Sequence, residues 1–245
     1  MIETMVVRHG EYGIDAPAVP ATFVGLGAAA LVPAVTGYPV RALRPLWVAL
    51  AALLGGSAAS YLYATRSGKF AAWADVLDEL GLRGDERVLD MGCGRGAVLL
   101  AAARRLGDGG QAVGVDLWRS VDQSGNAEAT TLANARAEGV ADRVELRTAD
   151  MTDLPFPDGS FDLVLSSLAI HNIPTPEGRA AAISEAVRVL RPGGRLAVAD
   201  IQHTSAYAER LRGLGLEPQV RDLGPRFWFG GPWVRTSLVT ATRPG

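Results

Sequence analysis

The chain has 245 residues and a formal net charge of −2 at pH 7. That length accommodates one ordinary domain with an additional segment, and the balanced charge gives no reason to expect nucleic acid as a partner. The single cysteine, Cys93, excludes an intrachain disulfide, and no cluster of histidines and cysteines has the spacing of a metal site.

Two apolar stretches near the N-terminus carry no charge, at residues 16–40 and 45–65. A helix of about 20 residues crosses the hydrocarbon core of a bilayer, and both stretches are long enough. We therefore predict a transmembrane helical hairpin, with residues 1–66 as a membrane-anchoring domain. The alternative is a buried, alanine-rich pair of helices packed on the main domain, which would need a core around both helices.

The second stretch carries further features of a membrane helix. Trp47, Tyr61 and Tyr63 lie near its ends, where aromatic side chains anchor helices at the membrane interface. Small residues also recur four positions apart, which allows close packing on another helix and hence an oligomer. These pairs are Gly55 with Ala59 and Gly56 with Ser60.

From residue 67 to residue 245 the pattern changes to alternating helices and strands. Helices are predicted at residues 70–82, 96–107, 126–140, 178–190 and 205–215. Strands are predicted at residues 87–92, 111–116, 143–150, 161–170 and 194–201, with residues 216–223 and 234–243 as a closing antiparallel pair. This alternation indicates an α/β domain with a Rossmann-like, doubly wound sheet of seven strands, following the membrane hairpin.

The stretch VLDMGCGRG at residues 88–96 is a glycine-rich turn between a strand and a helix. Such turns let a ligand approach the backbone at the carboxyl ends of parallel strands. The glycine spacing alone leaves a dinucleotide possible, since Ala97 occupies the third position of the looser fingerprint. Asp90 would lie badly beside a pyrophosphate, but its carboxylate suits the cationic amino group of S-adenosylmethionine.

Four ordered motifs carry a resemblance to a known family. They are VLDMGCGRG (88–96), GVDLW (114–118), ADMTDLPFPDGSFDLVLSSLAIHNI (149–173) and RVLRPGGRLAVAD (188–200). Over about residues 70–243 the sequence resembles the class I S-adenosylmethionine-dependent methyltransferases. The third and fourth motifs are most similar to the branch that methylates small molecules such as quinones and sterols.

The resemblance implies a set of contacts to S-adenosylmethionine. Asp90, Gly92 and Gly94 would face the methionine end, while Asp116 would bind the ribose and Leu117 would lie against the adenine.

Three further positions complete the implied cofactor site. Asp150 would hydrogen-bond the adenine amino group, the backbone N–H of Met151 would face the adenine ring, and Ser166 would line the methionine side.

His171 is the candidate general base, because it follows the fourth strand of the domain, near the expected position of the transferable methyl group. A base is needed only when the acceptor must lose a proton. His203 is a second choice, and a structural role for His171 stays open.

Two stretches could form the acceptor pocket. Trp118 begins a polar loop at residues 118–126, and Phe227 and Trp228 belong to the aromatic stretch PRFWFGGPW at residues 225–233. The aromatic stretch could instead form a lid on the sheet or a patch that enters the membrane.

Together these features predict a membrane-anchored methyltransferase that acts on a small, apolar or membrane-associated acceptor. Since S-adenosylmethionine is made in the cytosol, the catalytic domain should face the cytoplasm. Arg41 and Arg44 would then lie outside, against the positive-inside tendency. A nicotinamide-dependent oxidoreductase and a non-catalytic S-adenosylmethionine-binding scaffold are the alternatives.

Overall fold

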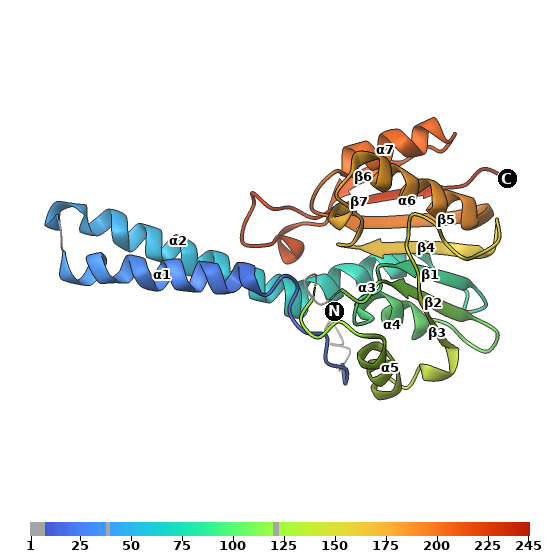
Figure 1. Ribbon diagram of the computed structural model, residues 1–245, viewed down its shortest axis with the longest axis horizontal. Helices are drawn as coiled ribbons and strands as arrows, with labels where there is room; N and C mark the ends of the chain where they lie inside the picture. The colour runs from blue at the N-terminus through green and yellow to red at the C-terminus, as the bar shows by residue number, and fades with distance from the viewer. Residues whose placement is uncertain (1–7, 38–39, 120–122) are drawn as a thin grey trace.

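The computed structural model of the chain describes residues 8–37, 40–119 and 123–245. A helical hairpin extends away from a layered α/β domain (Figure 1). The hairpin consists of α1 (Ala18–Thr36) and α2 (Arg44–Tyr63), with a short 3-10 helix, Arg41–Leu43, before α2. Gly37, in the left-handed conformation with φ of 74°, ends α1.

Helix α2 does not stop at the predicted domain boundary after residue 66. It continues through a π-helical turn, Ala64–Gly68, into α3 (Lys69–Leu80), the first helix packed on the sheet. Gly68 is needed there, because a Cβ atom would lie 1.6 Å from the carbonyl oxygen of Arg226. The hairpin and the α/β domain are therefore joined by one uninterrupted helical path.

Within the described residues, the sheet has seven strands in the order β3-β2-β1-β4-β5-β7-β6. Strands β1 to β5 are parallel, and β7 is antiparallel to both β5 and β6, which confirms the predicted sheet and its closing pair. The strands are β1 (Arg87–Met91), β2 (Gln111–Asp116), β3 (Val144–Thr148), β4 (Phe161–Ser167), β5 (Leu190–Asp200), β6 (Gln219–Asp222) and β7 (Ser237–Thr242).

Helices cover both faces of this sheet. On one face α3, α4 (Ala97–Ala103) and α5 (Glu128–Ala137) enclose a core that includes Trp73 and Leu99. On the other face α6 (Pro176–Val189) and α7 (Thr204–Gly213) enclose a second core that includes Ile183 and Tyr207. Since neighbouring residues of a strand point to opposite faces, Val88 enters the first core and Leu89 the second.

Strand β5 begins four residues earlier than the sequence predicts. Leu190 pairs with Phe161 across an irregularity in the β4–β5 ladder, so Pro192 and the two glycines after it are included in the strand. The predicted strand at residues 161–170 is shorter than expected, because a 3-10 turn at Ile170–Asn172 follows it. That turn carries His171 over the carboxyl end of the sheet.

Both hairpin helices leave most of their apolar surface exposed. The most apolar segments of α1 and of the continuous helical stretch Arg41–Leu80 have mean hydropathies of 1.8 and 1.5, and only 22% and 17% of these segments are buried. By length and composition, both helices could cross a membrane. The exposed large side chains of α1 and α2 are Val19, Val24, Leu26, Leu31, Val32, Val35, Leu46, Val48, Leu50, Leu53 and Tyr63.

Candidate functional site

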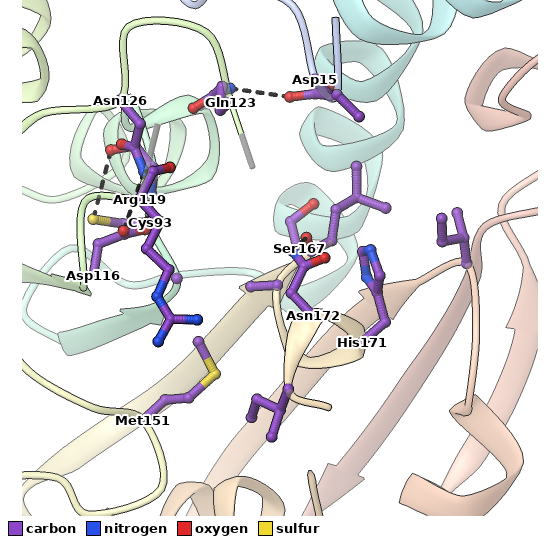
Figure 2. A pocket seen from close by; sticks show the side chains of 18 of the residues that line it. Asp15, Cys93, Asp116, Arg119, Gln123, Asn126, Met151, Ser167, His171 and Asn172 are labelled. Carbon is purple, nitrogen blue, oxygen red and sulfur yellow. Dashed lines mark hydrogen bonds between the residues drawn. The ribbon is translucent and has the colours of Figure 1, made fainter. Parts of the chain in front are cut away.

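A cavity of about 560 Å³ lies along the carboxyl ends of the parallel strands. It spans the position between β1 and β4 where the strand order reverses, the usual ligand position in such sheets. Figure 2 shows Asp116, Asn126 and Arg119 on one side of the cavity and His171 on the other. Eight of the predicted site residues line it: Asp90, Gly92, Gly94, Asp116, Leu117, Asp150, Met151 and His171.

The glycine-rich turn after β1 forms one wall of the cavity. Gly92 and Gly94 have φ of +75° and +50°, a region in which other residues are strained. A Cβ atom on Gly92 would lie 2.2 Å from that of Ala169, and one on Gly94 would lie 2.7 Å from Oε1 of Gln123. The backbone therefore reaches the cavity without side chains in the way.

Asp90 ends in the cavity wall as a buried carboxylate, only 1% exposed. Within the described part of the chain, its Oδ1 has no hydrogen-bond partner. Burial raises the pKa of Asp90 to about 7, and the negative charge of Asp116 adds to this effect. A cationic group in the cavity would supply the missing counter-charge.

Asp116 is held by donors from its own side of the cavity. Its Oδ2 accepts the N–H of Gly94 at 2.8 Å, and its Oδ1 accepts the N–H of Trp118 at 2.6 Å and the side-chain amide of Asn126 at 3.2 Å. Because a carboxylate has about four acceptor positions, Asp116 can still accept a ligand hydroxyl.

Asn126 is a site residue that the motifs did not single out, although the predicted polar loop 118–126 ends on it. Its side-chain oxygen is buried in the cavity wall and has no partner among the described residues. Beside the glycine turn, the side chains of Asp90, Asp116 and Asn126 present hydrogen-bond acceptors to the cavity. Oδ1 of Asp90 and Oδ1 of Asn126 have no partner among the described residues. This chemistry fits the amino group and the ribose hydroxyls of S-adenosylmethionine.

Ser166 does not line the cavity, although the resemblance implied that it would. Its hydroxyl donates to the carbonyl oxygen of Met91 on the neighbouring strand at 2.8 Å, and the side chain is buried. Ser167 lines the cavity instead. Successive strand residues point to opposite faces, so a shift of one position changes which serine reaches the ligand.

The side chain of Trp118 is also turned out of the cavity lining. Its backbone has a positive φ of 57°, and its indole N–H donates to Oγ1 of Thr148 at 2.8 Å, at the end of β3. The predicted acceptor contact of Trp118 is therefore replaced by packing beside the sheet. Leu117, which precedes it, lines the cavity and is 43% exposed.

The aromatic stretch between β6 and β7 contributes different residues from those predicted. Phe227 is fully buried in the core, and the indole N–H of Trp228 donates to Asp222 at 2.9 Å, so neither lines the cavity. Phe229 and Val234 do line it, and a hydrogen bond of 2.9 Å from the N–H of Phe229 to the carbonyl of Val234 joins them.

His171 lies against a buried aspartate that the sequence analysis did not identify. Its Nδ1 is 2.5 Å from Oδ1 of Asp200, although the contact does not have the geometry of a hydrogen bond. Its backbone N–H donates to the other carboxylate oxygen at 3.1 Å. Asp200 is the last residue of β5, which neighbours β4. Its place at the carboxyl end of a parallel strand is the sequence feature that could have identified it. His203 does not line the cavity.

The segment before the hairpin, residues 8–16, lies across the α/β domain and is here called the strap. The N–H groups of His9 and Gly10 and the hydroxyl of Tyr12 donate to one oxygen of Glu138, and the N–H of Glu11 donates to Asn134. Burial alone would raise the pKa of Glu138, but the bonds from His9, Gly10 and Tyr12 and the neighbouring Arg104 hold that pKa below its ordinary value. The strap ends at the cavity.

The base of the hairpin forms part of the cavity wall, which the sequence analysis did not anticipate. The residues involved are Asp15, Ala16, Val19, Phe23, Tyr61 and Lys69. Five of them fall outside the predicted methyltransferase domain of residues 67–245. The one sequence feature that pointed to them is Asp15, a charged residue directly before the apolar run that starts at residue 16.

Residues 89–198 match the family model described as a methyltransferase domain. Nocamycin O-methyltransferase of Saccharothrix syringae is 40% identical over 121 residues, which are 49% of this chain and 40% of the relative. The 27-O-demethylrifamycin SV methyltransferase of Amycolatopsis mediterranei (strain S699) is 37% identical over 146 residues, which are 56% of this chain and 48% of the relative. The chain therefore spans about half the length of the curated relatives it matches.

Two solved structures share the fold. The geranyl diphosphate C-methyltransferase of Streptomyces coelicolor A3(2), solved with S-adenosyl-L-homocysteine, has a TM-score of 0.57 at 21% identity, covering 71% of this chain and 79% of its own. A SAM-dependent methyltransferase from Aquifex aeolicus has a TM-score of 0.56 at 19% identity, covering 75% and 92%.

Proposed function

Because residues 89–198 form a class I S-adenosylmethionine-dependent methyltransferase domain, we propose that this chain transfers the cofactor's methyl group to a small, apolar acceptor. One observation carries the proposal. The same cavity holds a buried carboxylate, Asp90, one oxygen of which has no partner among the described residues, and the His171–Asp200 pair further along the sheet edge.

The cofactor supplies an electrophilic methyl group on a sulfonium. Asp90 would bind and orient the cationic amino group, and Asp116 and Asn126 would accept hydrogen bonds from the ribose hydroxyls. Asp150 and Met151, after β3, would face the adenine, with Leu117 against the ring. These residues would hold the methyl group in line with the acceptor, and such alignment lowers the barrier of the transfer.

His171 takes the proton that the acceptor loses. Nδ1 of His171 faces Asp200, so Nε2 is the nitrogen left to take a proton. The proton would come from a hydroxyl, an amine or an acidic C–H group of the acceptor. The buried Asp200 carboxylate stabilises the imidazolium that results. As the methyl–sulfur bond breaks and S-adenosylhomocysteine leaves, the acceptor would form its bond to the methyl carbon. Nε2 of His171 would take the proton that the acceptor loses, beside the negative charge of Asp200.

The proposal includes a membrane anchor. Helix α1 has 19 residues and is therefore about 28 Å long, close to the thickness of the hydrocarbon core. Its exposed apolar side chains and those of α2 support insertion of the hairpin. With the catalytic domain facing the cytoplasm, the tip reaches the opposite side, where Nε of Arg44 donates to the carbonyl of Ala34 at 2.9 Å. That hydrogen bond gives Arg44 a structural role at the turn of the hairpin, apart from any role in orienting the helices.

Calorimetry on the detergent-solubilised chain tests the cofactor assignment. We expect binding of S-adenosylmethionine and S-adenosylhomocysteine and no binding of NAD; binding of NAD alone would support an oxidoreductase instead. Incubation with cofactor carrying a tritiated methyl group, together with membranes and extracts of the source organism, tests the transfer. Cofactor binding without any labelled product would favour a non-catalytic scaffold.

A further inference from the structure

The order of strands arranges the cavity into two halves. Asp116 ends β2 and Asp150 comes shortly after β3, on the side of the sheet where the order is β3-β2-β1, and Asp90 lies on β1. His171 lies beyond them, after β4, and the residues contributed from the β5 and β7 side come last. The cofactor therefore accounts for the β1–β3 half, and the other half is left for the acceptor.

The acceptor half is apolar, and the hairpin supplies much of it. Phe229 and Val234 reach the cavity from the loop before β7, and Val19, Phe23 and Tyr61 reach it from α1 and α2. The two groups are in contact. The ring centroids of Tyr61 and Phe229 are 4.9 Å apart in an edge-to-face arrangement.

The loop before β7 is fitted to the hairpin base by backbone contacts as well. A Cβ atom on Gly230 would lie 3.1 Å from the ring of Phe23, and the hydroxyl of Ser60 donates to the carbonyl of Trp228 at 3.3 Å. These contacts fix the loop before β7 against the hairpin base, so the side chains that line this part of the cavity wall are held in place.

The charged residues near this wall are already paired. Lys69 donates to both carboxylate oxygens of Asp15 at 2.9 and 2.8 Å. The hydroxyl of Tyr61 donates to the backbone carbonyl of Asp15 at 2.9 Å, which leaves its ring facing Phe229. The acceptor half thus presents apolar surface beside His171 and no unpaired charge from these side chains.

The apolar wall continues into the surface that the bilayer would cover. Val19 and Phe23 occupy the first turns of α1, and the exposed valine that follows them, Val24, belongs to the lipid-facing surface. Tyr63 and Trp233 are 50% and 58% exposed, and aromatic residues of this kind concentrate at membrane interfaces. The cavity therefore opens at the level where the hairpin would enter the membrane.

We propose that Val19, Phe23, Tyr61, Phe229 and Val234 form the acceptor-binding wall, and that the acceptor is an amphiphile drawn from the bilayer. Its nucleophilic head reaches His171, and its apolar chain lies along the wall and leaves beside the hairpin base. The inference rests on the proposed methyl transfer and names the class of its substrate. It makes the hairpin a determinant of specificity as well as an anchor.

The test uses the full chain in phospholipid vesicles that contain the solvent-extracted membrane lipids of the source organism. Cofactor with a tritiated methyl group is added, and label is counted in the organic and aqueous phases. We expect label in the organic phase. Phe23→Ala should raise the KM for the lipid extract about tenfold or more, since it removes a large apolar contact. The KM for the cofactor should change by less than about twofold.

Val24→Ala is the matched control, because Val24 is the next residue of α1, is 56% exposed and does not line the cavity. It should leave both KM values unchanged. Label in the aqueous phase alone would overturn the amphiphile and leave the methyl transfer standing. Equal KM values for the two variants would overturn the wall assignment. Cofactor binding with no label in either phase would contradict the proposed function itself.

Discussion

Lys69 and Asp15 form a nearly buried ion pair, with Nζ of Lys69 2.8 Å from Oδ2 of Asp15 and side chains only 5% and 17% exposed. The pair joins the end of the strap to the first residue of α3. Thr65 donates to the same carboxylate from the π-helical turn, and Gln123 donates to it at 3.0 Å. Since Oε1 of Gln123 accepts the N–H of Arg95 in the glycine turn, Asp15 connects the hairpin to the cofactor half of the cavity.

Lys69→Met should lower the free energy of unfolding by about 3 kcal/mol, because it leaves the Asp15 carboxylate in a mostly buried site without a counter-charge. Cofactor affinity should also fall, because Gln123 loses a well-held partner. Denaturation and calorimetry of the full chain in detergent measure the two effects. Asp85→Asn, at an exposed ion pair with Arg83, should change stability by less than about 0.5 kcal/mol.

The double variant Asp15→Asn, Lys69→Met provides the control for the buried charge. It removes both charged groups, so it should be more stable than Lys69→Met alone. If the single and double variants were equally unstable, the lost lysine packing would account for the effect, and the ion pair would contribute nothing.

Asp90→Asn should weaken binding of S-adenosylmethionine about 100-fold or more, because the amino group of the cofactor loses its counter-charge. In the natural chain this affinity should fall about tenfold or more between pH 7.5 and pH 5.5. The reason is that the pKa of Asp90, raised to about 7 by burial, makes the carboxyl neutral at the lower pH. Calorimetry across this range should show that the dependence disappears in the variant.

The same group should affect the stability of the ligand-free chain in the opposite direction. The ordinary pKa of 3.8 applies to the unfolded chain and about 7 to the folded chain, so between these values only the folded state holds the proton. Stability from this group therefore falls as pH rises through that window. Asp90→Asn should raise the unfolding free energy at pH 7.5 by on the order of 2–4 kcal/mol. A destabilised Asn variant would show that the folded chain stabilises the ionised carboxylate of Asp90, which would contradict this prediction.

His171→Ala should lower kcat for methyl transfer about 100-fold or more, because it removes the proposed general base. The Kd for S-adenosylmethionine should stay within about twofold, because the cofactor residues lie on the other side of the cavity. Asp200→Asn should lower kcat by a smaller factor, since it leaves the imidazole but removes the charge that stabilises its protonated form. Unchanged turnover in His171→Ala would exclude it as the base.

Replacing residues 26–52 with a short glycine linker should move the protein from the membrane fraction to the soluble fraction. The base of the hairpin remains, so the Kd for S-adenosylmethionine should stay within about threefold. Truncation to a chain starting at Lys69 also removes the strap and Asp15, so we expect weaker cofactor binding from it. Cell fractionation and calorimetry measure these outcomes, and a shortened chain that stays in the membrane would contradict the anchor.

The grouping of the glycine turn, Asp90 and Asp116 around one cavity could be predicted from the sequence because its signals are local. The glycine turn follows directly on β1, and Asp116 directly ends β2, so parallel pairing alone brings them to one edge of the sheet. Asp200 likewise ends a parallel strand, β5, but the sequence analysis included it only as the last residue of the fourth motif. The prediction that Ser166 lines the cavity was wrong for a local reason too. Side chains alternate along a strand, so Ser167, one position further on, lines the cavity instead.

Sequence alone determined the two apolar runs, the order of strands and helices, and the cofactor motifs, because each depends on residues close together in the chain. Only the tertiary structure decided that the base of the hairpin forms part of the cavity wall. The contacts responsible join distant positions, such as Lys69 with Asp15, 54 residues apart, and Ser60 with Trp228, 168 residues apart. No local periodicity encodes such pairs, since they form only when the long helix from Arg44 to Leu80 aligns the hairpin with the sheet.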